Sequence, residues 1–201
     1  MKTKIKFRQV LLIALVALTS VNAQKKVQHF SVEKTINLPA EKVWEIVADD
    51  YGSIADSHPK IMKSEFLNGA TKGGEGVERN CFFNEKGTKV LHEKMTNYDA
   101  TNMTFTNLLI EAKKFPINPE YTTAVYKITK IGSHQCRISI SMTYRTKPAM
   151  MGAMAKGSFI KLMKDYFIAI EHHIKTGENV NSSNFKKFKN DYSNEATVIK
   201  S

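Results

Sequence analysis

A lysine in a predicted strand raises the first question of chemistry. In the segment "SHPKIMKSEF" (57–66), Lys63 follows Ile61 by two residues, so both side chains share one face of an extended chain. The other face carries Met62, Ser64 and Phe66. A lysine is seldom buried without a partner. Lys63 is therefore either an edge residue in water or a charge placed inside a cavity to meet a ligand.

Proton transfer would require a general base within hydrogen-bond reach of a substrate. Three side chains are weak candidates for that role: His58, Glu93 and Tyr144. His58 precedes Pro59 at the end of a predicted helix, which favours a turn or rim position. No set of nucleophile, base and acid can be picked out, so ligand binding is favoured over catalysis.

Metal and disulfide signals are weak in this sequence. It contains no CxxC, no HExxH and no cluster of histidine and cysteine, so we expect neither a metal nor a cofactor. Cys81 and Cys136 fall on predicted strands that are not neighbours in sequence. We expect two buried free thiols, with a disulfide as the alternative that export would allow.

The amino terminus has the three-part pattern of a secretory signal peptide. Four basic residues precede an apolar run from Val10 to Leu18, and small or polar residues follow as far as Ala23. The apolar run is shorter than the about 20 residues that cross a bilayer. We predict a signal peptide over residues 1–23 and an exported protein, periplasmic or secreted, with a retained anchor as the alternative.

The chain is basic, with a formal net charge of +11. Removal of residues 1–23 takes away four basic and no acidic residues and leaves +7. This excess favours weak association with anionic membrane surfaces. The lysines are scattered and an exported protein seldom meets nucleic acid, so we expect no nucleic-acid partner. The densest basic cluster, "NFKKFKND", lies in residues 178–201, which we predict to be a flexible polar tail.

The order of predicted elements indicates one α+β domain over residues 27–177. "VQHFSVEKTINL" alternates as a strand does, and "PAEKVWEIVADDYG" and "IADSH" then predict two short helices. Six segments with strand character, separated by turn residues, follow between Lys60 and Thr146. Such spacing predicts an antiparallel sheet.

A long amphipathic helix is predicted after the strands and ends before Gly177. Its apolar residues recur at helical spacing: Phe159, Met163, Tyr166, Phe167, Ile170 and Ile174. One apolar helix face requires cover, and a strongly curved sheet can supply it. The predicted fold class is therefore α+β, an antiparallel sheet with a long C-terminal helix.

This element order, with "LPAEKVWEIVAD", "GGEGVERNC" and "LHEKMTNYD", resembles the START-like or helix-grip (SRPBCC) superfamily, in its polyketide cyclase/dehydrase-like branch. The resemblance covers residues 27–177 and implies a curved antiparallel sheet wrapped around the long C-terminal helix, with a ligand cavity between sheet and helix. In the hormone-receptor members a lysine and a glutamate point into that cavity, and Lys63 and Glu93 look similar to them. The receptor gate loop is absent, because "FNEKGTK" is an ordinary tight turn, so a hormone-receptor function does not carry over.

Two functions follow from this resemblance. The first is a carrier for a small hydrophobic, lipid-like or amphipathic ligand, oriented by Lys63 and Glu93 as a pair. The second is a cyclase- or dehydratase-like enzyme that uses the same cavity. In either case the expected lining includes six apolar or aromatic side chains: Phe82, Leu91, Met142, Tyr144, Phe159 and Met163.

Overall fold

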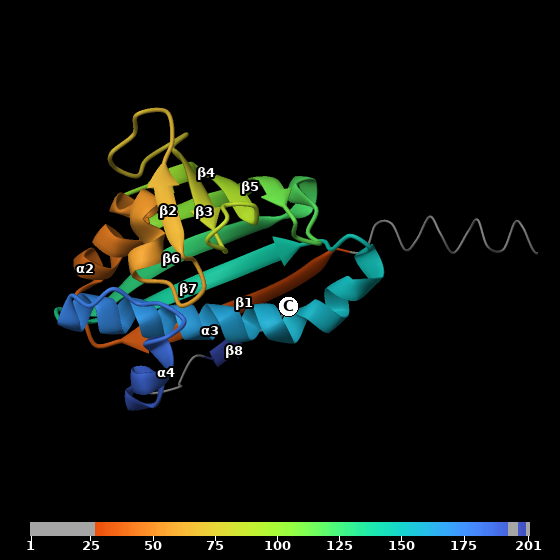
Figure 1. Cartoon of the computed structure of the whole chain (residues 1–201). Coiled ribbons are helices and arrows are strands. Elements are labelled where there is room, and N and C mark those ends of the chain that lie inside the picture. Colours follow the sequence, from red (N-terminus) through yellow and green to blue (C-terminus); the bar gives the residue numbers. More distant parts are fainter. Residues whose placement is uncertain (1–26, 193–196, 200–201) are drawn as a thin grey trace, which may run out of the picture.

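The computed structural model describes residues 27–192 and 197–199. The predicted signal peptide, residues 1–23, lies outside the described residues. An antiparallel sheet and one long helix dominate the described part of the chain (Figure 1).

The first strand, β1 (Gln28–Ile36), buries alternate side chains, as its sequence period predicts. Two short helical segments follow it: α2 (Ala40–Trp44), which continues as a π-helical turn over Glu45–Asp49, and a 3₁₀ helix over Tyr51–Asp56. Their apolar residues join the main core: Ala40, Val43, Trp44, Val47, Tyr51 and Ile54. The predicted pair of short helices is therefore present.

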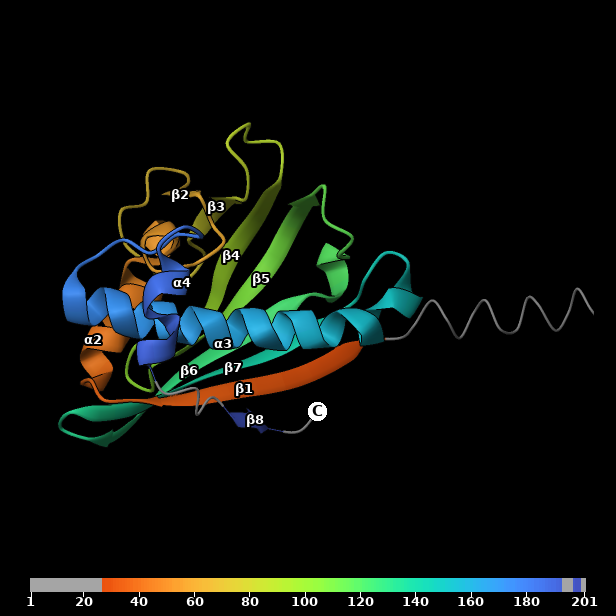
Figure 2. The ribbon, with the colours of Figure 1, turned by 60° about the horizontal axis from the view of Figure 1, so that its bottom comes forward.

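Six strands continue the sheet: β2 (Lys63–Phe66), β3 (Glu78–Phe82), β4 (Val90–Asp99), β5 (Thr104–Lys113), β6 (Thr123–Gly132) and β7 (Gln135–Tyr144). They pair antiparallel in sequence order, and β1 then pairs with β7. The sheet curves around the long helix (Figure 2). The predicted helix-grip fold is confirmed.

The long helix, α3 (Gly152–Thr176), stops at Gly177, whose φ of +73° is the left-handed conformation that glycine adopts easily. Phe167 and Ile170 are completely buried against the main core. An ion pair of 3.3 Å between Lys34 Nζ and Glu171 Oε2 also joins β1 to α3. The helix is thus held to the sheet by packing and by charge.

The segment after Gly177 differs from the predicted flexible polar tail. Through Tyr192 it folds over the outer face of α3, with a short helix, α4 (Phe185–Phe188), at its centre. Phe188 stacks on the His172 ring at a centroid distance of 3.5 Å. The carboxyl half of α3 also has apolar residues on its outer face, Ile168 and Ala169. Because burial of these side chains is favourable, the segment after Gly177 packs on them instead of extending into water. A last strand, β8 (Thr197–Ile199), pairs with β1.

Candidate functional site

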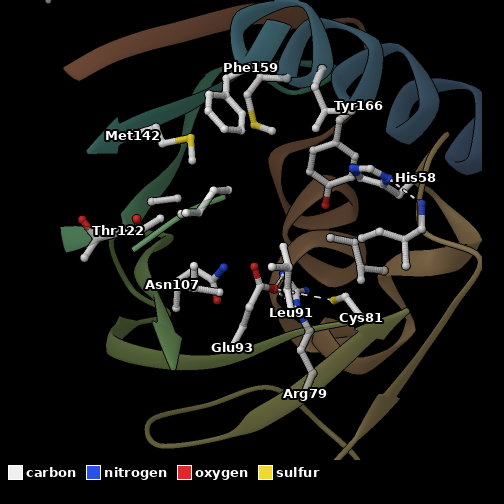
Figure 3. A pocket seen from close by; sticks show the side chains of 18 of the residues that line it. His58, Arg79, Cys81, Leu91, Glu93, Asn107, Thr122, Met142, Phe159 and Tyr166 are labelled. Carbon is white, nitrogen blue, oxygen red and sulfur yellow. Dashed lines mark hydrogen bonds and ion pairs between the residues drawn. The ribbon is translucent and has the colours of Figure 1, made fainter. Parts of the chain in front are cut away.

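A cavity of about 110 Å³ lies between the sheet and α3 (Figure 3). Its walls are mainly apolar, and α3 contributes Phe159, Leu162, Met163 and Tyr166. The sheet side adds Leu91, Leu109, Ala124 and Met142, together with a smaller group of polar side chains: Arg79, Cys81, Glu93, Asn107 and Tyr126. The cavity therefore combines apolar walls with one polar region.

A buried ion pair forms the centre of that polar region. Arg79 on β3 and Glu93 on β4 are directly opposite each other in the strand register. Arg79 Nε and Nη2 donate to the same oxygen, Glu93 Oε2, at 2.8 and 2.7 Å. The Arg79 side chain is 3% exposed, so this pair operates where water screens it little.

The short helices complete the surroundings of Arg79. Its Nη1 donates to the backbone oxygen of Tyr51 at 2.7 Å, and the guanidinium lies 3.8 Å from the centre of the Tyr51 ring. The Tyr51 hydroxyl in turn donates to Asn107 Oδ1 on β5. Burial alone would lower the pKa of Arg79, but Glu93 raises it well above its ordinary value, and the guanidinium stays charged.

One oxygen of Glu93 faces the cavity. Oε2 accepts from Arg79 and also from the Cys81 thiol, with a sulfur to oxygen distance of 3.6 Å. Figure 3 shows the other carboxylate oxygen turned toward the interior. The register between β4 and β5 shifts between His92 and Glu93, a bulge of the kind that redirects a side chain. The site thus presents a fixed hydrogen-bond acceptor to the cavity.

His58 also lines the cavity, next to Tyr166 (Figure 3). Its Nδ1 accepts from the backbone N–H groups of Lys60 and Ile61 at 3.0 and 3.1 Å. Burial, with a smaller contribution from Arg79, lowers the pKa of His58 to about 3. The neutral ring therefore carries its proton on Nε2 and can donate a hydrogen bond there.

His58 should make the protein less stable in mild acid. Its pKa is lowered in the folded state, so below pH 6.5 the unfolded chain binds a proton that the folded chain does not. We expect the free energy of unfolding to fall by up to about 1.4 kcal/mol per pH unit from pH 6.5 toward pH 3. Urea unfolding over this range measures the slope.

The matched variant is His58→Asn, whose side-chain oxygen can still accept from the two backbone N–H groups. Its unfolding free energy should depend less on pH over the same interval. An unchanged slope in His58→Asn would show that other groups cause the acid sensitivity.

The structure places three of the predicted cavity residues elsewhere: Lys63, Phe82 and Tyr144. Lys63 lies in water and pairs with Glu65 Oε2 at 2.7 Å, with 66% of its side chain exposed. Lys63 and its register partner Phe82 share the outer face of the sheet, where Phe82 lines a separate surface hollow. The inner face of β2 carries Ser64 and Phe66, because alternate residues of a strand point to opposite sides. The predicted Lys63–Glu93 pair is therefore wrong.

Tyr144 is also outside the cavity lining. It is fully buried in the core, and its hydroxyl donates to the backbone oxygen of Gly152 at 2.6 Å. This contact fixes the start of α3 against β7. The remaining candidates, Glu93, Leu91, Met142, Phe159 and Met163, do line the cavity together with His58.

Sequence reasoning missed Arg79, Tyr51 and Asn107. A signal for Arg79 was present in "VERNCFF", where Arg79 shares its strand face with the apolar Cys81 and Phe83. Asn107 likewise shares its strand face with the apolar Phe105 and Leu109. A polar residue on an otherwise apolar strand face can therefore indicate a buried polar site, and not only the edge of a sheet.

Both cysteines are buried and free, which agrees with the predicted thiols. Burial raises the pKa of Cys136 to about 11, and burial also raises that of Cys81. Both thiols are therefore protonated at neutral pH and are poor nucleophiles.

The described residues contain neither a metal-binding cluster nor a membrane-spanning helix. Within residues 27–192 and 197–199 there is no cluster of three or more histidine, cysteine or acidic side chains that could hold a metal ion. No helix in the same part of the chain is long and apolar enough to cross a membrane.

Several solved structures share this fold at low sequence identity. The protein XoxI from Bacillus cereus is 18% identical, with a TM-score of 0.60 over 74% of this chain and 96% of that one. Ara h 8.0201 is 20% identical, with a TM-score of 0.60 over 75% and 99% of the two chains. Norcoclaurine synthase from Thalictrum flavum, solved with dopamine and hydroxybenzaldehyde, is 17% identical, with a TM-score of 0.55 over 78% and 91%.

Sequence comparison supplies the family. No curated protein matches the chain. Residues 27–166, however, match the family described as "Polyketide cyclase / dehydrase and lipid transport", and these residues contain strands β1 to β7 and the first part of α3. The fold and this match agree, and the chain belongs to the polyketide cyclase/dehydrase and lipid-transport family.

Proposed function

We propose that this protein is an exported carrier that holds a small amphipathic molecule in the cavity beneath α3. The observation that carries the proposal is the cavity itself, whose apolar walls surround one carboxylate held by Arg79. Apolar walls with a few fixed polar groups are typical of sites that bind small molecules. The family and the fold support a hydrophobic ligand-binding domain.

The size of the cavity limits the ligand. About 110 Å³ is less than the roughly 150 Å³ of an apolar cavity that binds benzene. A larger ligand would require Met142 and Met163 to move, and methionine side chains change conformation readily. We therefore favour a single-ring aromatic or short-chain molecule over a long lipid.

The polar groups favour a ligand with a hydrogen-bond donor at one end. The inward oxygen of Glu93 accepts from an amine or a hydroxyl, and a charge-assisted bond of this kind is stronger than a neutral one. His58 also lines the cavity, and Nε2–H is the donor that its ring has left for a second polar group of the ligand, because Nδ1 accepts from the backbone. A ligand with a carboxylate at the Glu93 end is disfavoured by charge.

The cyclase-like alternative requires a general base in the cavity. His58 is poorly suited, since its Nδ1 lone pair already accepts two backbone hydrogen bonds and its pKa is lowered to about 3. Tyr144 is directed at Gly152. Glu93 also lines the cavity, but its Oε2 already accepts from Arg79 and from the Cys81 thiol, so only its other oxygen is left to face a substrate. Carriage is therefore the better-supported function.

The direct test is mass spectrometry of the protein purified from its native host. We expect denaturation to release a small molecule that the protein has left chemically unchanged. The intact mass of the same sample should correspond to a chain that begins at Gln24 and is recovered outside the cytoplasm. Turnover of the released compound by the pure protein would instead support the enzyme.

The role of Glu93 can be tested with probe ligands. By calorimetry, the mature protein should bind benzylamine or benzyl alcohol more tightly than benzoate. Glu93→Gln should weaken benzylamine binding about tenfold or more, since a charged hydrogen bond contributes about 1.5 to 3 kcal/mol.

Lys63→Gln is the matched control, because Lys63 lies in water outside the cavity, and it should leave affinity unchanged. Equal binding of benzoate and benzylamine, or an effect of the same size in both variants, would contradict the assignment of Glu93.

A further inference from the structure

Three methionines are exposed together at the start of α3. Met150, Met151 and Met154 are 75%, 44% and 81% exposed, and we call them the methionine patch. The first turn of α3 contains no acidic residue. We propose that the methionine patch and the lysines around it bind the surface of an anionic membrane.

The charge around the patch is complementary to anionic lipid. The segments 111–121 and 145–156 meet at this end of the sheet, and they carry five basic and two acidic residues. Lys114 and Lys147 are exposed and have no acidic partner among the ion pairs of the described residues. The amino end of α3 adds the positive end of its helix dipole.

The surface is held in place by backbone contacts. Asn118 N donates to Arg145 O at 2.7 Å, and Lys147 N donates to Pro116 O at 2.9 Å. These bonds tie the β5–β6 connection to the residues that lead into α3. The residues that lead into the methionine patch are therefore held in place by backbone hydrogen bonds.

The patch also lies beside one end of the cavity. Ile117, which lines the cavity, forms a bridge with Thr146, and Thr146 borders the surface hollow that contains Met150. Gln28 lies against Gly152, so β1 begins at this same end. Docking through the methionine patch would place this end of the cavity against the bilayer.

A second copy of the chain is a less suitable occupant than a membrane. A symmetric dimer would place the same surface of each copy together, and with it the basic residues of each. Like charges across an interface oppose association. Flexible methionines flanked by lysines suit a soft anionic surface, in which apolar side chains enter the interface while the lysines meet headgroups.

The test is flotation of the mature protein, which starts at Gln24, with vesicles of phosphatidylcholine alone or with 30% phosphatidylglycerol. We expect binding to the mixed vesicles, and weaker binding as salt rises. The triple change of Met150, Met151 and Met154 to serine should weaken binding about tenfold or more. Lys114→Gln with Lys147→Gln should weaken it roughly 25-fold, at about fivefold for each lysine.

Control variants lie on β6, away from the methionine patch. Ile131→Ser and Lys127→Gln alter an exposed apolar and an exposed basic residue, roughly 26 Å and roughly 13 Å along the strand from Thr123 at about 3.3 Å per residue. Both should bind as the unmodified protein does. The proposal is overturned if the triple serine variant binds equally well or if the controls lose as much. It is also overturned if the mixed vesicles do not bind, or if sedimentation shows a dimer that the serine changes dissociate.

Discussion

Arg79→Met is expected to lower the free energy of unfolding by about 3 to 5 kcal/mol, as loss of one partner from a buried ion pair does. The arginine is 3% exposed and supplies both short contacts to Glu93 Oε2 as well as the bond to Tyr51 O. Without it, Glu93 is left as a charge in an apolar cavity. Urea unfolding at pH 7 measures the loss.

The double variant Arg79→Met with Glu93→Leu tests whether the two charges are energetically coupled. Removal of both charges leaves no unpaired ion, so a large part of the lost stability should return. Binding of benzylamine should remain weak, because the acceptor is gone. Lys63→Ala is the control and should cost less than about 1 kcal/mol, as an exposed ion pair does. If the two single losses simply add to within about 0.5 kcal/mol, the residues are not coupled.

Phe167→Ala is expected to cost about 3 to 5 kcal/mol, the range for truncating a buried aromatic residue. Phe167 is completely buried on the inner face of α3 and belongs to the main core. The space it leaves is enclosed by sheet and helix, so the surroundings can collapse only in part. Thermal or urea unfolding of the single variant measures the effect.

Met154→Ala on the same helix is the matched control. Its side chain is 81% exposed, so the change should alter stability by less than about 0.5 kcal/mol. Similar losses in the two variants would mean that Phe167 does not pack as described.

The fold was predictable because its signals are local. Alternation along β1 and β7, helical spacing from Phe159 to Ile174, and Gly177 as a terminator each depend on residues close in sequence. The packing of the segment 178–192 on the outer face of α3 was harder to predict from the sequence. The segment 178–192 is polar in composition, and only its contact with Ile168 and Ala169 shows that Phe185 and Phe188 are buried.

The partners in the polar site could not be predicted from sequence spacing alone. "SHPKIMKSEF" shows that Lys63 and Phe66 lie on opposite faces of a strand, but not which face is inside. The structure turns Phe66 inward and leaves Lys63 in water. Glu93 was correctly placed at the cavity, but Lys63 was predicted as its partner, because spacing does not show which residue of a neighbouring strand lies opposite Glu93.

By itself, the sequence determined the element order, the antiparallel sheet and the apolar inner face of the long helix, since these follow from the period of apolar residues along the chain. The resemblance to a known family then implied the helix-grip fold. Only the tertiary structure decided that Arg79 holds Glu93, that Tyr51 and Asn107 complete their surroundings, and that Lys63 does not take part. The physical reason is that charges on separate strands become partners through register and sheet curvature. Both depend on the packing of the whole domain.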